Sequence, residues 1–409
     1  MTPGQAARAT DSMKSRVGIL LSHPTQYHSP WFRSLAQRPE IEIKVFYCLQ
    51  PDSSEQGTGF GVSFQWDVPL LEGYPHAFLK NVARRPGFHF TGSDTPEIAD
   101  TIASREFDVW IINGWRVQSE WQAIRACWRH NVPMLIRGDS HLLDHRPPHT
   151  RIGKRMILGR WIPRLDRYLT VGKLNEEYYK FYGADSSRFV PVRHFVDNER
   201  FAVQAAAVNV GELRARWKIA ENATVFLFAG KFVDKKKPMD AIKAIEKLFG
   251  GKPRVHLLMV GDGELKQPCE EYSASRGLPV TFAGFLNQSE IATAYACADV
   301  LVLPSAYAET WGLVVNEAMA CGVPAVVSDR VGCGPDLVCS VQTGAIFPAG
   351  DVDRLADAMS VYVVNQGLIG EHGANAKKLI ANYSIEAATD STVAAVLSVT
   401  GEQATACAG

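Results

Sequence analysis

Short apolar runs alternate with longer amphipathic segments along most of the chain. The apolar runs are rich in Val, Ile, Leu and Phe, which is typical of strands buried on both faces of a parallel sheet, and the segments between them have helical periodicity. We therefore predict strands at residues 16–22, 42–48, 107–114, 132–138, 167–172 and 188–192, and in the second half at 224–230, 255–261, 279–284, 298–305, 324–329 and 344–348. The principal helices are expected at 29–37, 119–130, 175–183, 239–249, 264–275, 289–298 and 314–322.

The two series of strands and helices predict an α/β fold with two doubly wound, Rossmann-like parallel-sheet domains facing across a cleft. The 409 residues also exceed the usual size of one domain. In such sheets ligands bind beyond the carboxyl ends of the strands, and a pair of domains holds its ligand between them. The expected division is a disordered tail at 1–15, an N-terminal domain at 16–205, a linker at 206–222, a C-terminal domain at 223–380, and at 381–409 a helix that packs back on the N-terminal domain, followed by a tail.

The composition excludes several classes of protein. Lys and Arg number 43, as do Asp and Glu, so no net charge indicates nucleic-acid binding. The eight cysteines include no CxxC pair and no zinc-like spacing, so we expect no structural metal site. The apolar runs are shorter than the roughly 20 residues of a membrane helix, and the N-terminus lacks the apolar core of a signal peptide. We therefore expect a cytoplasmic protein, with its oligomeric state left open.

The segment ETWGLVVNEAMACGVP, residues 309–324, follows a predicted strand and holds two glutamates, Glu309 and Glu317. Gly312 is expected to open a helix, so that backbone N–H groups of Gly312 and Leu313 face the cleft, where a helix N-terminus can bind phosphate. Glu317 lies about one turn further and can accept hydrogen bonds from two sugar hydroxyls. The alternative is an ordinary amphipathic helix with a solvated glutamate.

Residues that could bind a diphosphate or a base follow other predicted strands. Gly230 allows close backbone approach, and Lys231 and Lys237 follow it, two cations that suit a diphosphate unless they only form a solvated loop. Phe285 follows another strand, where its backbone could contact the edge of a base. These groups come from separate strands whose carboxyl ends share one edge of the sheet, so a common ligand is expected there.

Together these elements resemble the retaining, family-4 type of GT-B glycosyltransferase, of the glycosyl transferases group 1. The similar segments cover most of residues 222–365 in the family's order, and the pair of glutamates within its flanks is highly specific. The N-terminal half is similar mainly through VPVRHFVDNERF, residues 190–201. The matching segments are GKFVDKKKPMDAI, LLMVGDGEL, VTFAGFLNQSEI, ADVLVLPSAYAETWGLVVNEAMACGVPAVVSD and GAIFPAGDVDRLADAM.

The resemblance implies roles for particular residues. Lys231 and Lys237 would bind the donor diphosphate, Glu317 the ribose, and Glu309 the hydroxyls of the transferred sugar. A histidine near the reacting sugar would be His141, with Asp139 as its rival. The remaining donor-side candidates are Gly230, Phe285, Thr310, Trp311, Gly312 and Leu313.

The first predicted strand departs from the family pattern. In place of a glycine-rich loop, this chain has HPTQYHSP, which brings His23, Gln26 and His28 to the cleft. These side chains could contact the acceptor or the donor phosphate, or they could pack the loop and cap the following helix. Trp115, after another strand, is a further acceptor-side candidate.

The implied reaction is a retaining transfer from a nucleotide diphosphate sugar, with a UDP-sugar expected, to the hydroxyl of a glycan, lipid-linked or small-molecule acceptor in bacterial glycan or glycoconjugate biosynthesis. No DxD-like site is present, so we expect metal independence, and no cofactor besides the nucleotide-sugar co-substrate. Three alternatives stay open: nucleotide-sugar binding without transfer, a sugar-nucleotide epimerase or hydrolase of the same fold, and glycosylation of a small natural product. A dinucleotide dehydrogenase is disfavoured because no G-x-G-x-x-G follows the first strand.

Residues 145–173 hold eight Lys or Arg and one acid. This segment could form a weak peripheral contact with anionic lipid at the inner face of a membrane. It could equally be a solvated helix that covers the sheet.

Overall fold

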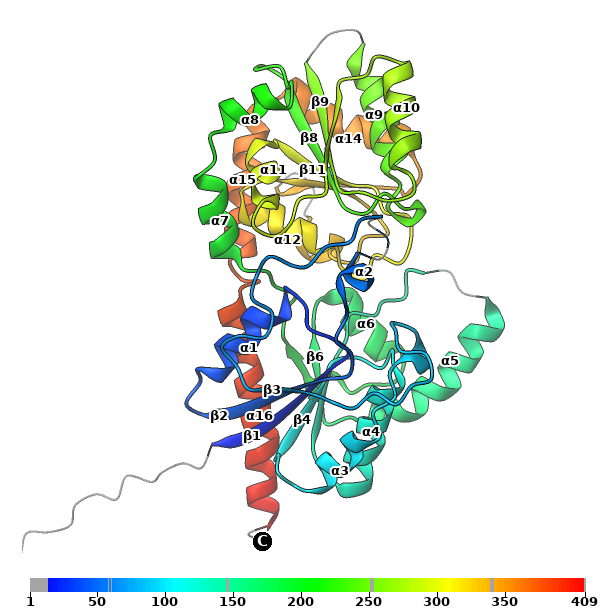
Figure 1. The fold of residues 1–409 in the computed structure, drawn as a ribbon, viewed down its shortest axis with the longest axis vertical. Helices are drawn as coiled ribbons and strands as arrows, with labels where there is room; N and C mark the ends of the chain where they lie inside the picture. Colours follow the sequence, from blue (N-terminus) through cyan, green and yellow to red (C-terminus); the bar gives the residue numbers. More distant parts are fainter. Residues whose placement is uncertain are drawn as a thin grey trace, which may run out of the picture.

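The computed structural model describes residues 14–57, 59, 61–144, 147–250, 254–338 and 342–407. The predicted tail at 1–15 lies almost entirely outside these residues, as do His145 and Arg146 of the basic segment. The described chain forms two α/β domains stacked along the long axis, each built on a parallel sheet with helices on both faces (Figure 1). This is the fold class expected from the alternation of buried runs and amphipathic segments.

The N-terminal sheet has seven strands in the order β3-β2-β1-β4-β5-β6-β7, and all the pairs are parallel. Six of these strands overlap predicted ones. The seventh, β3, was missed because its three residues are largely exposed and give no buried run. The strands are β1 (Ser15–Leu21), β2 (Ile41–Tyr47), β3 (His76–Phe78), β4 (Val109–Ile112), β5 (Met134–Arg137), β6 (Arg167–Thr170) and β7 (Phe189–Pro191).

Helices pack on both faces of this sheet. One apolar core lies under α1 and the C-terminal helix α16, and the other lies under α3, α4, α5 and α6. The helices are α1 (His28–Ala36), α2 (Ser53–Gln56), α3 (Glu97–Ala103), α4 (Gln118–His130), α5 (Pro148–Trp161), α6 (Lys173–Phe181) and α16 (Ile385–Cys407).

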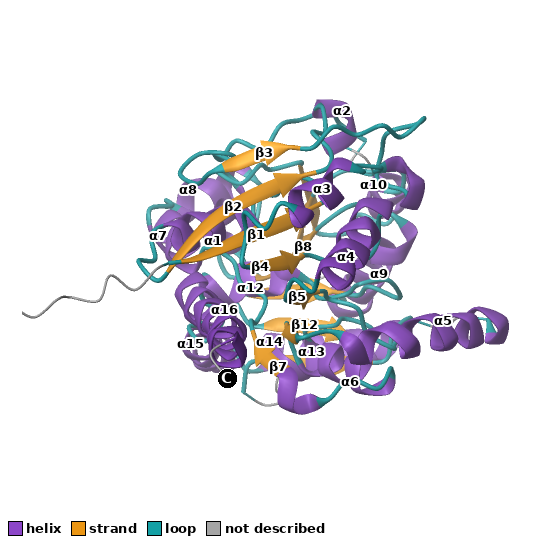
Figure 2. Ribbon diagram, turned by 90° about the horizontal axis from the view of Figure 1, so that it is seen from below, coloured by secondary structure: helices purple, strands orange, loops and turns teal. Residues whose placement is uncertain are grey.

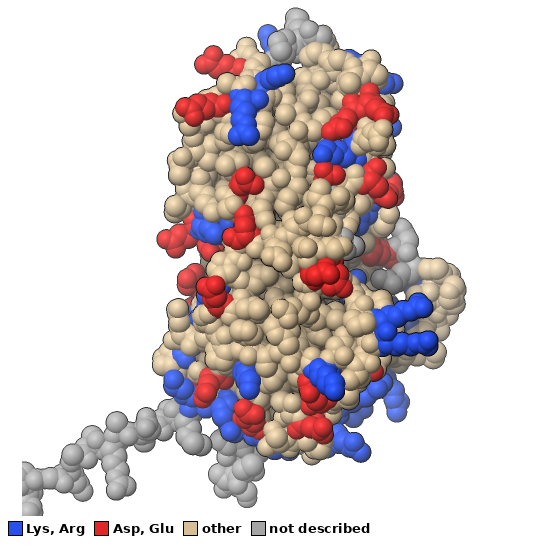
Figure 3. All heavy atoms as spheres, in the orientation of Figure 1, with Lys and Arg blue, Asp and Glu red and all other residues tan. Residues whose placement is uncertain are grey.

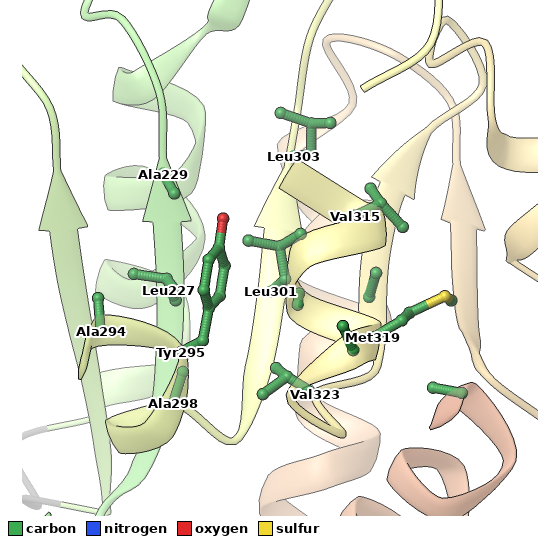
Figure 4. Close-up of a cluster of buried hydrophobic side chains, with 14 of the residues drawn as sticks. Leu227, Ala229, Ala294, Tyr295, Ala298, Leu301, Leu303, Val315, Met319 and Val323 are labelled. Carbon is green, nitrogen blue, oxygen red and sulfur yellow. The ribbon is translucent and has the colours of Figure 1, made fainter. Parts of the chain in front are cut away.

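The C-terminal sheet has six parallel strands in the order β10-β9-β8-β11-β12-β13. On one face α11 and α12 bury an apolar core in which the Tyr295 ring stands beside Leu227 and Leu301, with its hydroxyl toward the carboxyl ends of the strands (Figure 4). The strands are β8 (Thr224–Ala229), β9 (Val255–Val260), β10 (Val280–Gly284), β11 (Val300–Leu303), β12 (Ala325–Ser328) and β13 (Gly344–Phe347). The helices are α9 (Pro238–Phe249), α10 (Lys266–Ser275), α11 (Ile291–Cys297), α12 (Leu313–Ala320), α13 (Gly334–Leu337), α14 (Val352–Val364) and α15 (Gly367–Ile380).

Two connections join the domains. The first runs through α7 (Asn198–Ala206) and α8 (Val210–Arg216), which pack on α11, so much of the segment 206–222 is helical. The second is α16, which returns along the N-terminal domain beside α1 (Figures 1 and 2). Hydrogen bonds fix this return, because Thr389 Oγ1 donates to Ser34 Oγ at 2.9 Å and Thr400 Oγ1 lies 3.0 Å from Ser15 Oγ.

The surface carries interspersed charges of both signs on the face shown in Figure 3. The helix α5 projects from the body of the N-terminal domain (Figure 2) and exposes Ile152, Met156 and Ile157 by 62%, 68% and 59%. Among the described residues, no helix is both long enough and apolar enough to cross a bilayer.

Candidate functional site

The loops that follow β5 and β11 meet between the domains. The Thr310 hydroxyl donates to Asp139 Oδ2 at 2.6 Å, and His141 Nε2 lies 3.2 Å from the carbonyl oxygen of Glu309. The two N-terminal residues predicted to lie near the transferred sugar are thus in contact with the segment that carries Glu309. The structure brings these parts of the candidate site together from opposite domains.

The His141 ring is held in one tautomer. The Leu143 N–H donates to Nδ1 at 3.2 Å, so Nδ1 is unprotonated and Nε2 carries the proton that it donates to the Glu309 carbonyl. Both ring nitrogens therefore have partners, and the ring holds the Glu309 loop in position.

Glu309 is buried, and its carboxylate has specific partners. Oε2 accepts a hydrogen bond and ion pair from Lys236 Nζ, and a hydrogen bond from Ser305 Oγ at 2.8 Å. Burial by itself raises the pKa of Glu309, but the charge and hydrogen bond of Lys236 outweigh it, so the net pKa lies below its usual value. Glu309 is consequently ionised at neutral pH.

Lys236 is a residue that the sequence interpretation missed. A short 3-10 turn at Asp234–Lys236 points Lys236 toward Glu309, whereas Lys237, at φ 48°, caps α9 and pairs with Asp234 Oδ1 at 2.6 Å on the surface. The run of consecutive lysines has no periodicity that distinguishes inward from outward side chains. The turn makes that distinction, and it places Lys237 apart from Glu309.

Positive charge collects where β8 ends. Gly230 continues the sheet by donating its N–H to Val260 at 3.0 Å, and Lys231 follows directly. The pKa of Lys231 is lowered, first by burial and then by the charges of Lys235 and Lys236. These three cations create a local potential that favours an anion.

The N-terminus of α12 adds to this potential. Gly312 has φ 100°, and a Cβ there would lie 3.1 Å from side-chain atoms of Leu303 and Val331, so this left-handed turn requires glycine. The helix begins at Leu313, and no acid occupies its first turn. The first N–H groups of a helix lack intrahelical partners and carry partial positive charge.

Glu317 is almost completely buried, at 2% exposure, and its carboxylate has two phenolic partners. Tyr27 of the N-terminal domain donates to Oε1 at 3.0 Å, and Tyr295 of α11 donates to Oε2 at 2.6 Å. Burial raises the pKa of Glu317. A ribose at this carboxylate would have to share it with, or displace, these hydroxyls.

A loop of the N-terminal domain covers the C-terminal sheet near Phe285. The ring of Phe64 lies 4.3 Å from that of Phe285, and Asn287 Nδ2 donates to the Gln65 carbonyl at 2.7 Å. In Figure 1 this segment, which follows α2, runs up to the C-terminal domain. The sequence interpretation did not place this loop in the site, since the contact joins residues more than 200 positions apart.

Near the carboxyl ends of β2 and β3 lies a pocket of about 300 Å³ whose lining includes Gln50, Glu55 and Phe88. The His23 ring lies 4.7 Å from the Phe88 ring, so His23 borders this pocket. Burial, with a smaller contribution from Arg116, lowers the pKa of His23 to about 4, which leaves the ring neutral at pH 7.

The other loop candidates contact neighbouring groups. The Gln26 side chain forms a hydrogen bond with the Tyr27 hydroxyl. His28 is the first residue of α1, and its ring contacts Arg137. Trp115 packs against Tyr178 with ring centroids 6.1 Å apart, within an aromatic cluster of the N-terminal core.

Trp311 is buried at the domain contact. Its Nε1 donates to Asn316 Oδ1 at 2.8 Å, and Asn316 Nδ2 donates in turn to the His194 carbonyl at 3.0 Å. A Cβ on Gly172 would lie 2.5 Å from the Trp311 ring, so the two domains are closely packed here. These contacts hold the two segments of the candidate site together. In the described part of the chain, no three His, Cys, Asp or Glu side chains are grouped so that they could hold a metal ion.

Known proteins similar in sequence to this chain include glycosyltransferases. The family model described as "Glycosyl transferases group 1" matches residues 209–380. The chain is 28% identical over 357 residues to D-inositol 3-phosphate glycosyltransferase 2 of Catenulispora acidiphila, covering 77% of this chain and 79% of that protein. It is 32% identical over 175 residues to the sulfoquinovosyl transferase SQD2 of Arabidopsis thaliana, covering 42% of this chain and 30% of that one.

Solved structures share the fold at low sequence identity. A glycosyltransferase from Rickettsia africae superimposes with a TM-score of 0.71 at 14% identity, covering 95% of this chain and 99% of its own. The Anabaena protein Alr3699/HepE, in a complex with UDP, gives a TM-score of 0.70 at 16% identity, covering 94% and 100%. The C-terminal domain is therefore similar to the glycosyl transferases group 1 family, and the two-domain arrangement matches the fold of these glycosyltransferase structures, the GT-B fold.

Proposed function

We propose that this protein is a retaining glycosyltransferase that moves a sugar from a nucleotide diphosphate donor, most simply a UDP-sugar, to an acceptor hydroxyl in bacterial glycan or glycoconjugate biosynthesis. The observation that carries the proposal is the cationic group formed by Lys231, Lys235 and Lys236 at the end of β8, beside the ionised Glu309. The fold neighbour HepE was solved with UDP and with UDP-glucose, which supports a UDP-linked donor.

The leaving diphosphate is the group that needs most stabilisation. As the glycosidic bond to phosphate breaks, negative charge grows on the phosphate oxygens, and preformed cations and N–H dipoles lower that barrier. Lys231, Lys236 and the first turn of α12 supply this charge in our proposal, with Lys237 at its outer edge. The reaction then needs neither a metal ion nor a cofactor.

Glu309 and the N-terminal loop position the sugar and the acceptor. In the proposal the Glu309 carboxylate accepts hydrogen bonds from sugar hydroxyls, while Lys236 keeps it ionised and fixed. Asp139 and His141 border the same segment from the acceptor side. The leaving phosphate takes the acceptor proton on the same face of the sugar, which retains the anomeric configuration.

A thermal-shift panel of nucleoside diphosphates and their sugars tests this proposal. A nucleotide at 100 times its dissociation constant should add about 2.7 kcal/mol to the free energy of unfolding. Lys231→Met should remove most of this gain, because it deletes a cation at the diphosphate. Lys247→Met is the matched control, since Lys247 pairs with Asp353 at the surface. The proposal is wrong if no nucleotide stabilises the protein.

The three alternatives predict different products. Binding without transfer predicts stabilisation by nucleotide but no turnover with any acceptor. A hydrolase or epimerase consumes the donor without an acceptor, whereas a transferase releases free UDP only when an acceptor is present. Glycosylation of a small natural product predicts turnover with free small molecules. The anomeric proton coupling of the product in NMR then tests retention.

We further propose that α5 gives the protein a weak peripheral contact at the inner membrane face. Its exposed Ile152 and Met156 lie beside Arg155 and Arg160, and its sequence holds no acid. Such a surface can insert apolar side chains at the headgroups while its cations meet anionic lipid, worth about 1 kcal/mol per basic residue.

Vesicle co-sedimentation measures this contact. The full chain should sediment with vesicles that contain anionic lipid and much less with neutral ones, and Ile152→Glu/Met156→Glu should lower the bound fraction about tenfold. Val364→Glu, at an 87% exposed residue of α14, is the matched control and should sediment like the parent protein. Equal sedimentation of both variants would rule out α5 as the contact.

A further inference from the structure

Arg137, the last residue of β5, is a buried cation without a carboxylate partner in the described part of the chain. Its side chain is only 3% exposed, and no described Asp or Glu oxygen lies within 4.0 Å of its nitrogen atoms. The guanidinium lies over the rings of Trp31 and Phe195, at 5.4 Å from each ring centroid. The charge of Asp139 acts on Arg137 from beyond ion-pair distance, but a buried cation without a direct ion pair is still costly, so its retention calls for a reason.

The polar partners of Arg137 are two histidines. Its NH1 lies 3.3 Å from His28 Nε2, and its NH2 lies 3.4 Å from His194 Nδ1. A guanidinium only donates, so each ring nitrogen that faces it is an unprotonated acceptor and both imidazoles are neutral. Burial and the charge of Arg137 lower the pKa of both histidines, in keeping with this assignment.

Two buried donors in this cluster have no acceptor. They are the Nε–H of Arg137 and the Nε2–H of His194, whose other nitrogen already accepts from Arg137. A buried N–H without a partner costs about 1–3 kcal/mol, so two of them beside a cation are exceptional. Burial lowers the pKa of Arg137 to about 10, which leaves it charged at neutral pH. The two N–H donors and the positive charge of Arg137 suit a group that accepts hydrogen bonds and carries negative charge.

The cluster lies at the edge of the N-terminal sheet that faces the candidate site. The ring centroids of His194 and Trp311 lie 5.2 Å apart. Tyr27, the residue before His28, donates a hydrogen bond to Glu317. His28, His194 and Asn113 are all partly exposed, and Asn113 Nδ2 lies 3.4 Å from His28 Nε2. Because these side chains beside Arg137 are partly exposed, rotation of an imidazole would give an incoming group access to the guanidinium.

We propose that Arg137, with His194 and Asn113, binds an anionic group of the acceptor, either a phosphate ester or a carboxylate. This inference rests on the proposed transfer reaction and names the class of its acceptor: a molecule that presents an anion to the N-terminal sheet and a hydroxyl to the sugar. Lys231 and Lys236 already serve the donor diphosphate on the opposite domain. The Arg137 cluster therefore provides a second, separate anion site.

A purely structural role predicts different behaviour. If the guanidinium only fills space between two aromatic rings, its replacement by methionine destabilises the protein and anions have no effect. If Arg137 instead binds an anion, Arg137→Met removes a buried charge that has no ion-pair partner. The thermal midpoint measured without anion then stays the same or rises. The increment from added anion then disappears. The two roles thus differ in the sign of the effect and in its dependence on anion.

The experiment titrates inorganic phosphate, and acetate in parallel, into the full chain with and without saturating UDP, with ionic strength held constant by chloride. We expect phosphate or acetate to raise the thermal midpoint, and Arg137→Met to weaken the affinity measured by calorimetry about ten- to a hundredfold. Arg214→Met is the control, because Arg214 is a partly buried arginine, 19% exposed, that pairs with Asp299. It should bind the anion like the parent protein.

A second variant and the UDP titration keep the inference testable if Arg137→Met cannot be studied. Should Arg137→Met fail to fold, Asn113→Ala removes a partly exposed neutral donor and should weaken anion binding about two- to tenfold. Equal anion binding by the parent and both variants, or none by the parent, would overturn the inference. Loss of the Arg137-dependent part of phosphate binding when UDP is saturating would assign the cluster to the donor and overturn the acceptor site. If UDP itself does not bind, the proposed transfer fails, while the titration without UDP still tests Arg137.

Discussion

Replacing Lys236 with methionine should lower the free energy of unfolding by about 3–5 kcal/mol at neutral pH. The side chains of Lys236 and Glu309 are only 12% and 11% exposed, so the pair is removed from most solvent. Removing the cation leaves an ionised carboxylate buried with Ser305 Oγ as a partner. The loss is measured by urea unfolding of the full chain.

The size of this loss should depend on pH. In the parent protein the pKa of Glu309 lies below its unfolded value, so the pair's stabilisation is present above the usual glutamate pKa and disappears as the pH falls through the folded value. In Lys236→Met, burial is no longer opposed by Lys236, and the folded pKa should rise above the unfolded one. The difference between the two proteins should therefore be largest near neutral pH, and it should shrink as the pH falls from the raised pKa of the variant to the lowered pKa of the parent protein.

The neighbouring lysine provides the control. Lys237→Met breaks the pair with Asp234, whose side chain is 61% exposed, and surface pairs contribute only about 0–1 kcal/mol. The double variant Lys236→Met/Glu309→Gln should recover most of the lost stability, because no charge is then buried alone. Equal losses for Lys236→Met and Lys237→Met would contradict the assignment of Lys236 as the partner of Glu309.

The lysine example shows what the sequence could predict in this fold. Buried runs such as 224–230 and 298–305 predicted both sheets because strands covered on two faces exclude polar residues along their whole length. The short, exposed β3 has no such signal and was missed. Strand ends also indicated Lys231 and Glu309 as candidate site residues, since ligands of parallel sheets gather there.

Contacts across the domain boundary could not be predicted in the same way. Tyr27 meets Glu317 across 290 positions, and Phe64 meets Phe285 through a loop without regular structure. No local periodicity encodes such a pairing, because it depends on how two separately folded sheets face each other. The sequence indicated His28 as a loop residue near the cleft, but its contact with the buried Arg137 required the three-dimensional packing.

The two glutamates of residues 309–324 should have separable roles. Glu317→Gln keeps the size of the side chain but replaces one acceptor oxygen with a donor. If Glu317 binds the ribose as proposed, the ribose hydroxyls lose a charged acceptor worth about 1.5–3 kcal/mol. We expect the dissociation constant of UDP to rise about ten- to a hundredfold. Glu309→Gln should change UDP affinity little but lower kcat about a hundredfold or more, because it contacts the transferred sugar in the proposed reaction.

A tyrosine variant tests whether Glu317→Gln weakens UDP binding because a contact with the ribose is lost. Tyr27→Phe removes the hydroxyl that occupies Glu317 Oε1 but leaves the carboxylate intact. If ribose uses that oxygen, UDP should bind to Tyr27→Phe as well as or more tightly than to the parent protein, since one competing donor is gone. Calorimetry with UDP measures both variants. Weakening of UDP binding by Tyr27→Phe to the same extent as by Glu317→Gln would instead mean that the contact between the domains, and not the carboxylate, governs the binding of the nucleotide.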